Sequence, residues 1–358
     1  MWKSLKDRAE GVKEMKRMKT TEAVGQVLCH DITQIIPGVT KDAVFRKGHI
    51  IREEDIPVLL SVGKDSVYIW ENDETMMHEN DAAEVLYRMT ANEHMHPSDV
   101  KEGKIEAIAD TEGLLKVDRE KLKKVNAFGE MMIATRHGNT VVKKGDKLAG
   151  TRIIPLVIKK DKMQEAEKIC DGTPILKILP FTVKKAAIIT TGNEVYHGRI
   201  KDAFTPAIEQ KIAEFGAEMM FHEIFDDNDR KITDGCLRAI EAGADIVFCT
   251  GGMSVDPDDK TPLAIKNTGA EMISYGSPVL PGAMFLLSYY RKGDKVIPIC
   301  GLPGCAMYNR RTIFDLVLPR LMAADPVTAD ELASLGEGGL CLNCKVCTFP
   351  NCGFGKGW

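Results

Sequence analysis

Apolar residues in the second half of the chain follow two alternating patterns, short continuous runs and longer helical spacings. Ile208, Ile212 and Phe215 recur at three- and four-residue intervals before Gly216, which is typical of a helix and its end. The continuous runs are typical of buried strands, and they are Ala186–Thr190, Asp245–Thr250 and Val296–Cys300. Repeated strand–loop–helix order predicts an α/β fold: a three-layer α/β/α domain with a mostly parallel sheet.

Two helix boundaries in this half can be predicted from capping chemistry. Thr205 followed by Pro206 predicts a helix start, with the threonine hydroxyl as N-cap and the proline as first helical residue. After the turn Gly301–Gly304, the pattern predicts a helix that runs through Leu321.

The first half of the chain is richer in short β-branched runs between glycines and charged residues. Four of them predict strands: Val24–Leu28, Ala43–Phe45, Ser66–Trp70 and Thr140–Val142. Residues 80–91 and 117–128 have helical patterns, and the basic first residues predict a solvated helix. The expected organisation is therefore a basic helix over 1–19, a β-rich region over 20–182 with a division near residue 100, an α/β domain over 183–326, and a tail over 327–358.

Composition supports a globular, multidomain protein. The chain has 358 residues, of which 44% are hydrophobic and 28% charged, and its net charge is 48 − 52 = −4. This balance argues against a nucleic-acid partner, because binding to a polyanion favours a basic protein. The apolar runs are too short to span a membrane, and the basic start is not followed by a signal-peptide core, so we expect a cytoplasmic protein.

Glycine-containing loops follow all three predicted strands. They are Thr190–Glu194, Gly251–Asp259 and Gly301–Cys305. Glycine allows the backbone to approach a ligand closely, and backbone N–H groups at the start of a helix favour phosphate. Ser254 can donate a hydrogen bond to a phosphate oxygen, and Asp256 or Asp259 can hold the Mg²⁺ that accompanies a phosphate. The loops therefore predict a phosphate-bearing ligand at the ends of the strands.

In order and spacing, these loops resemble the molybdopterin-binding domain of molybdenum-cofactor biosynthesis proteins of the MoaB/MogA/MoeA type. That family carries T-G-x-E, G-G-x-S-x-G-x-x-D, P-G and G-L-P-G-N-P. Here TTGNE stands at 190–194, GGMSVDPDD at 251–259, PG at 281–282 and GLPGC at 301–305. The resemblance covers about two fifths of the chain, over residues 184–323. It also extends to the MoeA-like molybdopterin molybdenumtransferases, through Arg46–Ile51 and Asp55–Pro57 in the first half.

The resemblance implies a role for each matching residue. Ser254, together with Gly251 and Gly252, would bind the phosphate, and Asp259 would take the place of the Mg²⁺-associated aspartate. Asp259, Ser254 and Asp256 are thus the candidate catalytic residues. The remaining cofactor-binding candidates are Thr191, Gly192, Glu194, Pro281, Gly282, Gly301, Pro303, Gly304 and Cys305.

Several positions depart from the family pattern. Asp256 replaces a glycine, Ala283 stands where insertases usually have lysine, and Cys305-Ala306 replaces Asn-Pro. Cys305 is either a packing cysteine or, at a helix start that favours thiolate, a ligand for molybdenum. The S-x-M-D-G-Y-A signature of insertases is missing from the first half.

Four of the ten cysteines fall within the last twenty residues: Cys341, Cys344, Cys347 and Cys352. The first three spacings match an iron–sulfur run, whereas the fourth is longer than usual. We expect a [4Fe–4S] cluster here in preference to Zn²⁺, which usually takes two separated C-x-x-C pairs. An unmetallated tail is the remaining alternative.

The leading hypothesis is an enzyme that binds molybdopterin with Mg²⁺ and transfers molybdate to it. A carrier or redox-linked regulator that only binds the cofactor is the first alternative, favoured by Ala283 and Asp256. A nucleotide pyrophosphatase of the competence/damage-inducible type, which shares this domain, is the second. The resemblance also implies a homo-oligomer, and the tail suggests a molybdoenzyme client. Molybdenum and tungsten are equally compatible with the sequence.

Overall fold

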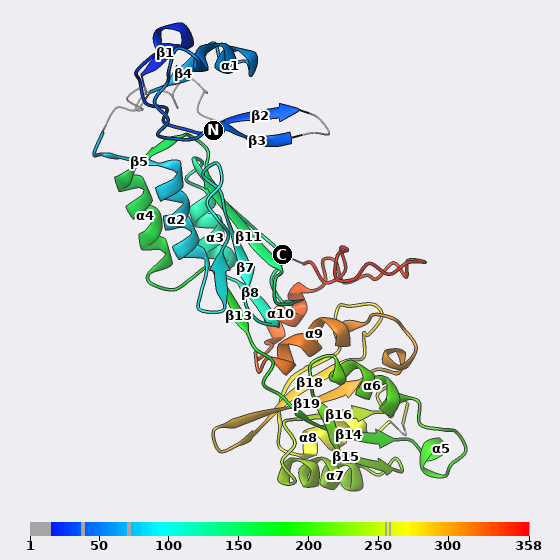
Figure 1. Cartoon of the computed structure of the whole chain (residues 1–358). Coiled ribbons are helices and arrows are strands. Elements are labelled where there is room, and N and C mark those ends of the chain that lie inside the picture. The colour runs from blue at the N-terminus through cyan, green and yellow to red at the C-terminus, as the bar shows by residue number, and fades with distance from the viewer. Residues whose placement is uncertain (1–15, 37–39, 70–72, 255, 258, 358) are drawn as a thin grey trace.

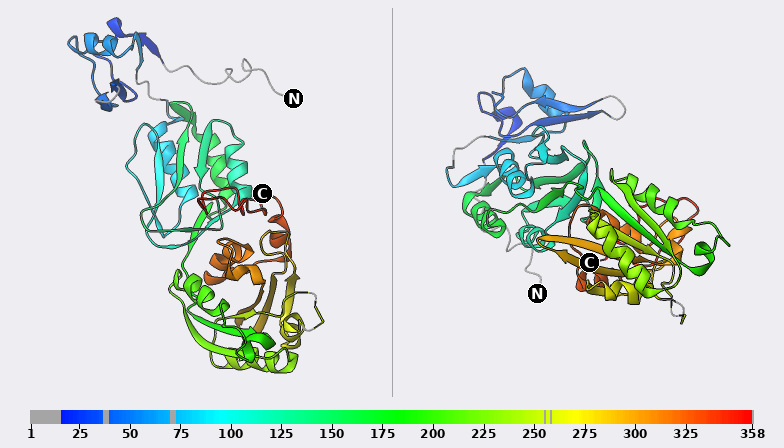
Figure 2. Two further views of the ribbon diagram at one scale, coloured as in Figure 1. Left: turned by 90° about the vertical axis from the view of Figure 1, so that its right-hand side faces the viewer. Right: turned by 90° about the horizontal axis from the view of Figure 1, so that it is seen from below.

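The computed structural model describes residues 16–36, 40–69, 73–254, 256–257 and 259–357. Three parts follow one another along an elongated molecule, and the tail lies at the junction of the second and third parts (Figures 1 and 2). Among the described residues, no helix has both the length and the apolar character needed to cross a membrane.

The first part, residues 16–69, has a small core of its own around Leu28, Leu59 and Val67. Its elements are β1 (Arg17–Lys19), η1 (Thr20–Glu22), β2 (Ile32–Ile36), β3 (Thr40–Phe45), α1 (Asp55–Ser61) and β4 (Ser66–Tyr68). Arg17–Lys19 pairs with β4 as a strand, so the expected helix does not reach residue 19; residues 1–15 lie outside the described residues. The strand expected at Val24–Leu28 is wrong, because only Val27 and Leu28 form isolated bridges.

The second part, residues 76–179, is built around one buried cluster that extends from Ala82 to Ile178. Because this cluster continues across residue 100, the division between cores falls between Ile69 and Met76 instead. Its helices are α2 (Glu79–Thr90), α3 (Arg119–Asn126) and α4 (Lys160–Cys170). Its strands are β5 (Met76–His78), β6 (Met95–Pro97), β7 (Ile105–Ala109), β8 (Gly113–Val117), β9 (Met131–Thr135), β10 (Thr140–Val142), β11 (Lys147–Ile153), β12 (Val157–Lys159) and β13 (Leu176–Leu179).

The third part is an α/β domain with a six-stranded sheet in the order β15-β14-β16-β19-β18-β17. The first four strands are parallel, and β18 runs antiparallel to both of its neighbours, β19 and β17, which confirms the expected mostly parallel sheet. The strands are β14 (Lys185–Thr191), β15 (Glu218–Phe225), β16 (Ile246–Thr250), β17 (Glu271–Tyr275), β18 (Leu286–Lys292) and β19 (Lys295–Leu302).

Helices cover both faces of this sheet and give the expected three layers (Figure 1). One face buries Ile188 and Phe248 against α6 (Phe204–Ala213) and α9 (Ile313–Met322). The other buries Ile189 and Val247 against α7 (Asp229–Glu241) and α8 (Thr261–Asn267). Two short helices complete the domain, α5 (Asn193–Tyr196) and η2 (Gly304–Met307).

Two predicted helix starts are wrong. Helix α6 begins at Phe204, and the Asp202 carboxylate accepts the backbone N–H groups of Phe204 and Thr205 at 2.8 and 3.1 Å, so Thr205 is not the N-cap. After the turn at Gly304 the chain forms only η2, and α9 begins at Ile313 with a capping box from Thr312.

The tail is anchored in the α/β core. Helix α10 (Ala329–Ser334) contributes Leu332 to that core, and Phe354 is buried in the same cluster. The Cys341 N–H donates to the Leu280 carbonyl at 2.8 Å, and the Arg119 guanidinium of the second part donates to the Gly357 carbonyl at 3.1 Å. The tail therefore contacts both neighbouring parts.

Candidate functional site

The three glycine loops lie along one edge of the α/β sheet. Because β14, β16 and β19 are parallel and in register, Thr190 lies beside Thr250, and Thr250 beside Leu302. The turn before β18 reaches the same edge, since Leu286 pairs with Gly301. The topology therefore brings together the loops after Thr191, Thr250 and Leu302, as expected for ligand sites in open α/β folds.

Threonine hydroxyls tie the first loop to the second. Thr191 Oγ1 donates to the Thr250 carbonyl at 3.1 Å, and Thr261 Oγ1 donates to the Gly251 carbonyl at 2.8 Å. The two hydroxyl oxygens lie 3.0 Å apart. Gly251 has a φ of +80°, and a Cβ there would lie 2.1 Å from the Thr191 carbonyl oxygen. The glycine at this position is thus required by the packing of the two loops.

A second polar cluster lies under the first loop. Thr205 Oγ1 donates to the Asp202 carboxylate at 2.5 Å, and His222 Nε2 lies 3.1 Å from the same hydroxyl. Thr190 Oγ1 also donates to Asp202, at 3.0 Å. Burial alone would raise the pKa of Asp202, but the hydrogen bonds from Thr205, Thr190 and Phe204 outweigh it and hold the pKa below its ordinary value.

The second loop, which carries the candidate catalytic residues, is partly folded onto itself. The Asp256 N–H donates to the Asp259 carboxylate at 3.2 Å, and the Asp259 N–H donates to the Asp256 carbonyl at 2.9 Å. Tyr275 at the end of β17 donates its hydroxyl hydrogen to the Met253 carbonyl at 3.0 Å. Ser254 is exposed, so its hydroxyl is accessible to a ligand.

Pro281 and Gly282 pack against the start of α9. The Ile313 N–H donates to the Pro281 carbonyl at 3.1 Å, and a Cβ on Gly282 would lie 2.3 Å from Ile313 Cγ2. Cys305 lies inside η2, and burial raises the pKa of its thiol. Cys305 is the second residue of this short helix, and the raised pKa of its thiol favours the packing alternative over a thiolate ligand.

All four tail cysteines line one cavity of about 490 Å³. The segment after the third glycine loop provides the opposite wall: Arg310 donates to the Lys345 carbonyl at 3.1 Å, and Arg311 lies 4.8 Å from the centre of the Phe349 ring. Burial lowers the pKa of Arg311, but its hydrogen bonds to Asp315 and Cys347 outweigh burial and raise it. Within the described residues, no three histidine, cysteine or acidic side chains are already close enough to hold a metal ion.

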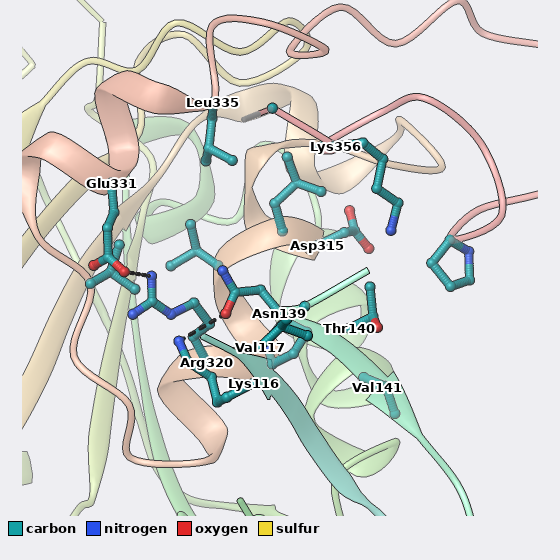
Figure 3. Close-up of a pocket in the computed structure, with 18 of the residues that line it drawn as sticks. Lys116, Val117, Asn139, Thr140, Val141, Asp315, Arg320, Glu331, Leu335 and Lys356 are labelled. Carbon is teal, nitrogen blue, oxygen red and sulfur yellow. Dashed lines mark hydrogen bonds and ion pairs between the residues drawn. The ribbon is translucent and has the colours of Figure 1, made fainter. Parts of the chain in front are cut away.

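The largest of the cavities described here lies elsewhere, between the second part, α9 and the tail (Figure 3). It has a volume of about 740 Å³ and a mixed lining. Arg320 pairs with Glu331 at 2.8 Å, and Lys116 donates to the Asn139 side chain at 2.8 Å. Val117, Val141 and Leu335 supply apolar walls (Figure 3). This interdomain cavity is separate from the strand-end loops and was not expected from the sequence.

Two family models match the chain. Residues 187–323 match a family described as "Probable molybdopterin binding domain", and residues 17–71 match a "Domain of unknown function (DUF8806)". A molybdopterin-binding domain of the MoaB/Mog type is therefore supported for the third part of the chain.

The chain is also similar to proteins named competence-damage inducible. A Bacillus cereus (strain B4264) relative is 30% identical over 129 residues, which cover 36% of this chain and 30% of that protein. A Bacillus subtilis (strain 168) relative is 32% identical over 85 residues, which cover 24% and 20%. The chain thus spans less than a third of the length of these curated relatives.

Among solved structures, the chain is similar to the tungsten cofactor synthesizing protein MoaB from Pyrococcus furiosus. The two share 20% identity with a TM-score of 0.32, over 39% of this chain and 89% of that one. A molybdenum cofactor biosynthesis protein from the same organism covers 88% of this chain and 66% of its own, with 12% identity and a TM-score of 0.24.

Sequence reasoning missed the residues that hold the loops in place, namely Thr261, Tyr275, Asp202 and His222. Thr261 precedes Pro262, the same hydroxyl–proline pattern as at Thr205, and it could have been found this way. Strand pairing brings Tyr275 and His222 to the site, and neither residue belongs to a motif that could be recognised in the sequence.

Proposed function

We propose that the strand-end edge of the α/β domain binds molybdopterin, and that the protein transfers molybdate to it. The observation that carries this proposal is the convergence of three glycine loops, all within the matched segment 187–323, at one edge of a parallel sheet. The phosphate-binding residues of this proposal are Gly251, Gly252 and Ser254. The pterin-lining residues are Thr191, Gly192, Glu194, Pro281, Gly282, Gly301, Pro303, Gly304 and Cys305.

The residues at this edge fit such a ligand. Thr250 Oγ1 is buried without a hydrogen-bond partner among the described residues, and it lies next to Gly251 in the second loop. A buried hydroxyl left unpaired costs free energy, so a polar ligand atom at this position would stabilise the loop. Asp259 and Asp256 fit a Mg²⁺ ion, because Mg²⁺ needs only one or two carboxylates when it also binds a phosphate. Mg²⁺ would there neutralise phosphate charge and act as a Lewis acid.

The transferase proposal is tested by turnover. The full chain is incubated with adenylylated molybdopterin and molybdate, and both AMP release and metal loading of the pterin are measured. Asp259→Asn should abolish turnover, whereas the matched control Asp294→Asn, an exposed carboxylate in the β18–β19 turn, should retain it. Equal activity of the two variants would contradict the assignment of Asp259.

Ala283 favours a second candidate, a carrier that binds the cofactor without chemistry. The Ala283 side chain is exposed, and neither residue between Gly282 and Phe285 has a positive charge that could bind molybdate. Binding of molybdopterin without turnover would support the carrier. Release of nucleoside monophosphate from simple dinucleotides would instead support the nucleotide pyrophosphatase. Failure to bind any pterin would overturn both molybdopterin proposals.

We also propose that Cys341, Cys344, Cys347 and Cys352 hold a [4Fe–4S] cluster, with Zn²⁺ as the alternative. One observation supports this: all four cysteines line one cavity, to which Arg311 also contributes. Anaerobic purification should give iron, sulfide and absorbance near roughly 400 nm, as thiolate clusters show. Cys344→Ser should lose the metal and Cys305→Ser should keep it. Colourless protein with zinc would support the alternative, and metal-free protein would overturn both.

A further inference from the structure

A third, smaller cavity lies where the turn between β9 and β10 meets the tail. Its volume is about 330 Å³, and it is separate from the strand-end loops. Its lining residues are Thr135, Arg136, His137, Thr140, Pro350, Asn351, Cys352 and Lys356. The tail supplies part of this lining, and its Lys356 is more than two hundred residues from Arg136 in the chain. The cavity is therefore formed only when the tail is docked.

Three of the side chains that line this cavity are basic, and Cys352, also a proposed cluster ligand, is the one that can carry a negative charge. Arg136, His137 and Lys356 are basic, and no carboxylate is among the residues that line the cavity. Arg136 forms one ion pair outside it, with Asp146 at 2.8 Å. Lys356 is half-buried, and within the described part of the chain its ammonium forms no ion pair. Two cations and an imidazole thus share one lining, in which Arg136 has an anionic partner and Lys356 has none among the described residues.

The pKa of His137 indicates that positive charges surround its side chain. Partial burial lowers the pKa of its imidazole, and the positive charges of Lys356 and Arg119 lower it further. An anion between these groups would offset both effects, since a nearby negative charge favours the charged imidazolium. The cavity is therefore electrostatically suited to an anion.

Neutral donors in the same lining suit an oxyanion in particular. Thr135 brings a hydroxyl group, and Asn351 brings a side-chain amide. The Thr140 hydroxyl donates to the His137 carbonyl at 2.7 Å, which fixes the turn that carries the imidazole. Guanidinium, ammonium and hydroxyl donors around one point are the groups that proteins use for phosphate.

The cavity lined by Arg136, His137 and Lys356 adjoins the interdomain cavity. Lys356, Thr140 and Pro350 line both, and Lys356 and Thr140 are seen on the same side of the interdomain cavity in Figure 3. The interdomain cavity has apolar walls and, at about 740 Å³, a volume within the range of small-molecule sites, roughly 300–1,000 Å³. The two cavities together have the form of a site for an anionic group attached to a larger organic body.

We propose that Arg136, His137 and Lys356 form a binding site for a phosphate-class tetrahedral oxyanion, held between the β-rich region and the docked tail. The ligand is either the free oxyanion or the phosphate of a small organic ester whose body occupies the interdomain cavity. This site is distinct from the strand-end loops and does not depend on the molybdopterin proposal.

The test is a titration of the full chain with inorganic phosphate and, separately, with AMP. The His137 ring resonances are followed by NMR after assignment with His137→Gln, so that binding at the glycine loops is not mistaken for binding here. Phosphate should shift these resonances. Lys356→Met, which keeps the aliphatic stem, should weaken the effect at least about tenfold. Lys168→Met removes an equal charge from the exposed face of α4 and should change nothing.

The two ligands distinguish the two sources of the oxyanion. Tighter binding of AMP than of phosphate would support an organic ester in the interdomain cavity, and equal binding would support a free oxyanion. His137 resonances that do not move with either ligand would overturn the proposal. So would a Lys356→Met protein that binds phosphate as tightly as the unaltered chain.

Discussion

The strand-end edge and the junction around the tail are two candidate sites built in opposite ways. The edge is made from one continuous segment, 185–323, whose neighbouring strands bring the loops together through hydroxyl hydrogen bonds of 2.8–3.1 Å. The junction joins residues 112–143 to residues 311–357, and it depends on a few anchors such as Phe354 and the Arg119–Gly357 hydrogen bond. Sequence motifs can therefore predict a site that is made from one continuous segment. A site that is made from distant segments can be found only from the fold.

The largest effect is expected from removing the main anchor of the tail. Phe354→Ala should cost about 3–5 kcal/mol of tail docking, because it leaves a cavity in the α/β core. Amide hydrogen exchange should rise sharply over residues 335–357 and little at the strand-end edge. Phe349→Ala, at a partly buried ring, is the control and should have a smaller effect. Equal loss of protection at both regions would show that they form one cooperative unit.

The second effect concerns the tight contact between the first two glycine loops. Gly251→Ala should destabilise the α/β domain by about 3 kcal/mol, since its Cβ would overlap the Thr191 carbonyl. Gly269 has a similar φ, +82° against +80°, but nothing lies within 4 Å of the position that a Cβ would take there. Gly269→Ala should therefore cost only about 1–2 kcal/mol of backbone strain. Urea unfolding of both variants measures the difference, and equal costs would mean that the loops can separate freely.

A smaller effect is expected at Thr261. Thr261→Val keeps the side-chain shape but removes the hydroxyl that donates to the Gly251 carbonyl, which should cost about 1–2 kcal/mol. The matched variant Thr268→Val removes a buried hydroxyl that bonds only within the end of α8, at Ile265 and Ala270. Any pterin affinity should fall in the first variant and not in the second. A loss of affinity in both would point to a general loss of stability.

The smallest effect is the pH dependence contributed by Asp202. Its pKa in the folded protein lies below the ordinary value of about 3.9, so its hydrogen bonds stabilise the fold above that pH. This contribution is lost as the pH falls through the lower folded-state pKa. Asp202→Asn should therefore flatten the acid side of the stability–pH curve, measured by urea unfolding between pH 2 and 5, roughly the range in which carboxyl groups titrate. An unchanged acid slope would contradict this role of Asp202.

The strands and layers of the α/β domain were predictable because their apolar runs are continuous and end at glycines, as at Ala186–Thr190 and Asp245–Thr250. The antiparallel strands β17 and β18 were not predicted, since Leu286–Lys292 mixes apolar and polar residues. At Thr205, the N-cap prediction failed because α6 already begins at Phe204, and the Asp202 carboxylate accepts the N–H groups of Phe204 and Thr205. The cavities at the tail involve Lys356 and Arg136, whose proximity depends on the docking of two distant segments.

The interdomain cavity also has a consequence for the newly made chain. One wall comes from residues 112–143, and the other is completed only by residues 311–357. At roughly 5–20 residues per second, the first wall leaves the ribosome on the order of ten seconds before the second. During that interval Val117 and Val141 have no tail or α9 to cover them. A chaperone that binds exposed apolar surface would meet this protein most readily at that stage of its synthesis.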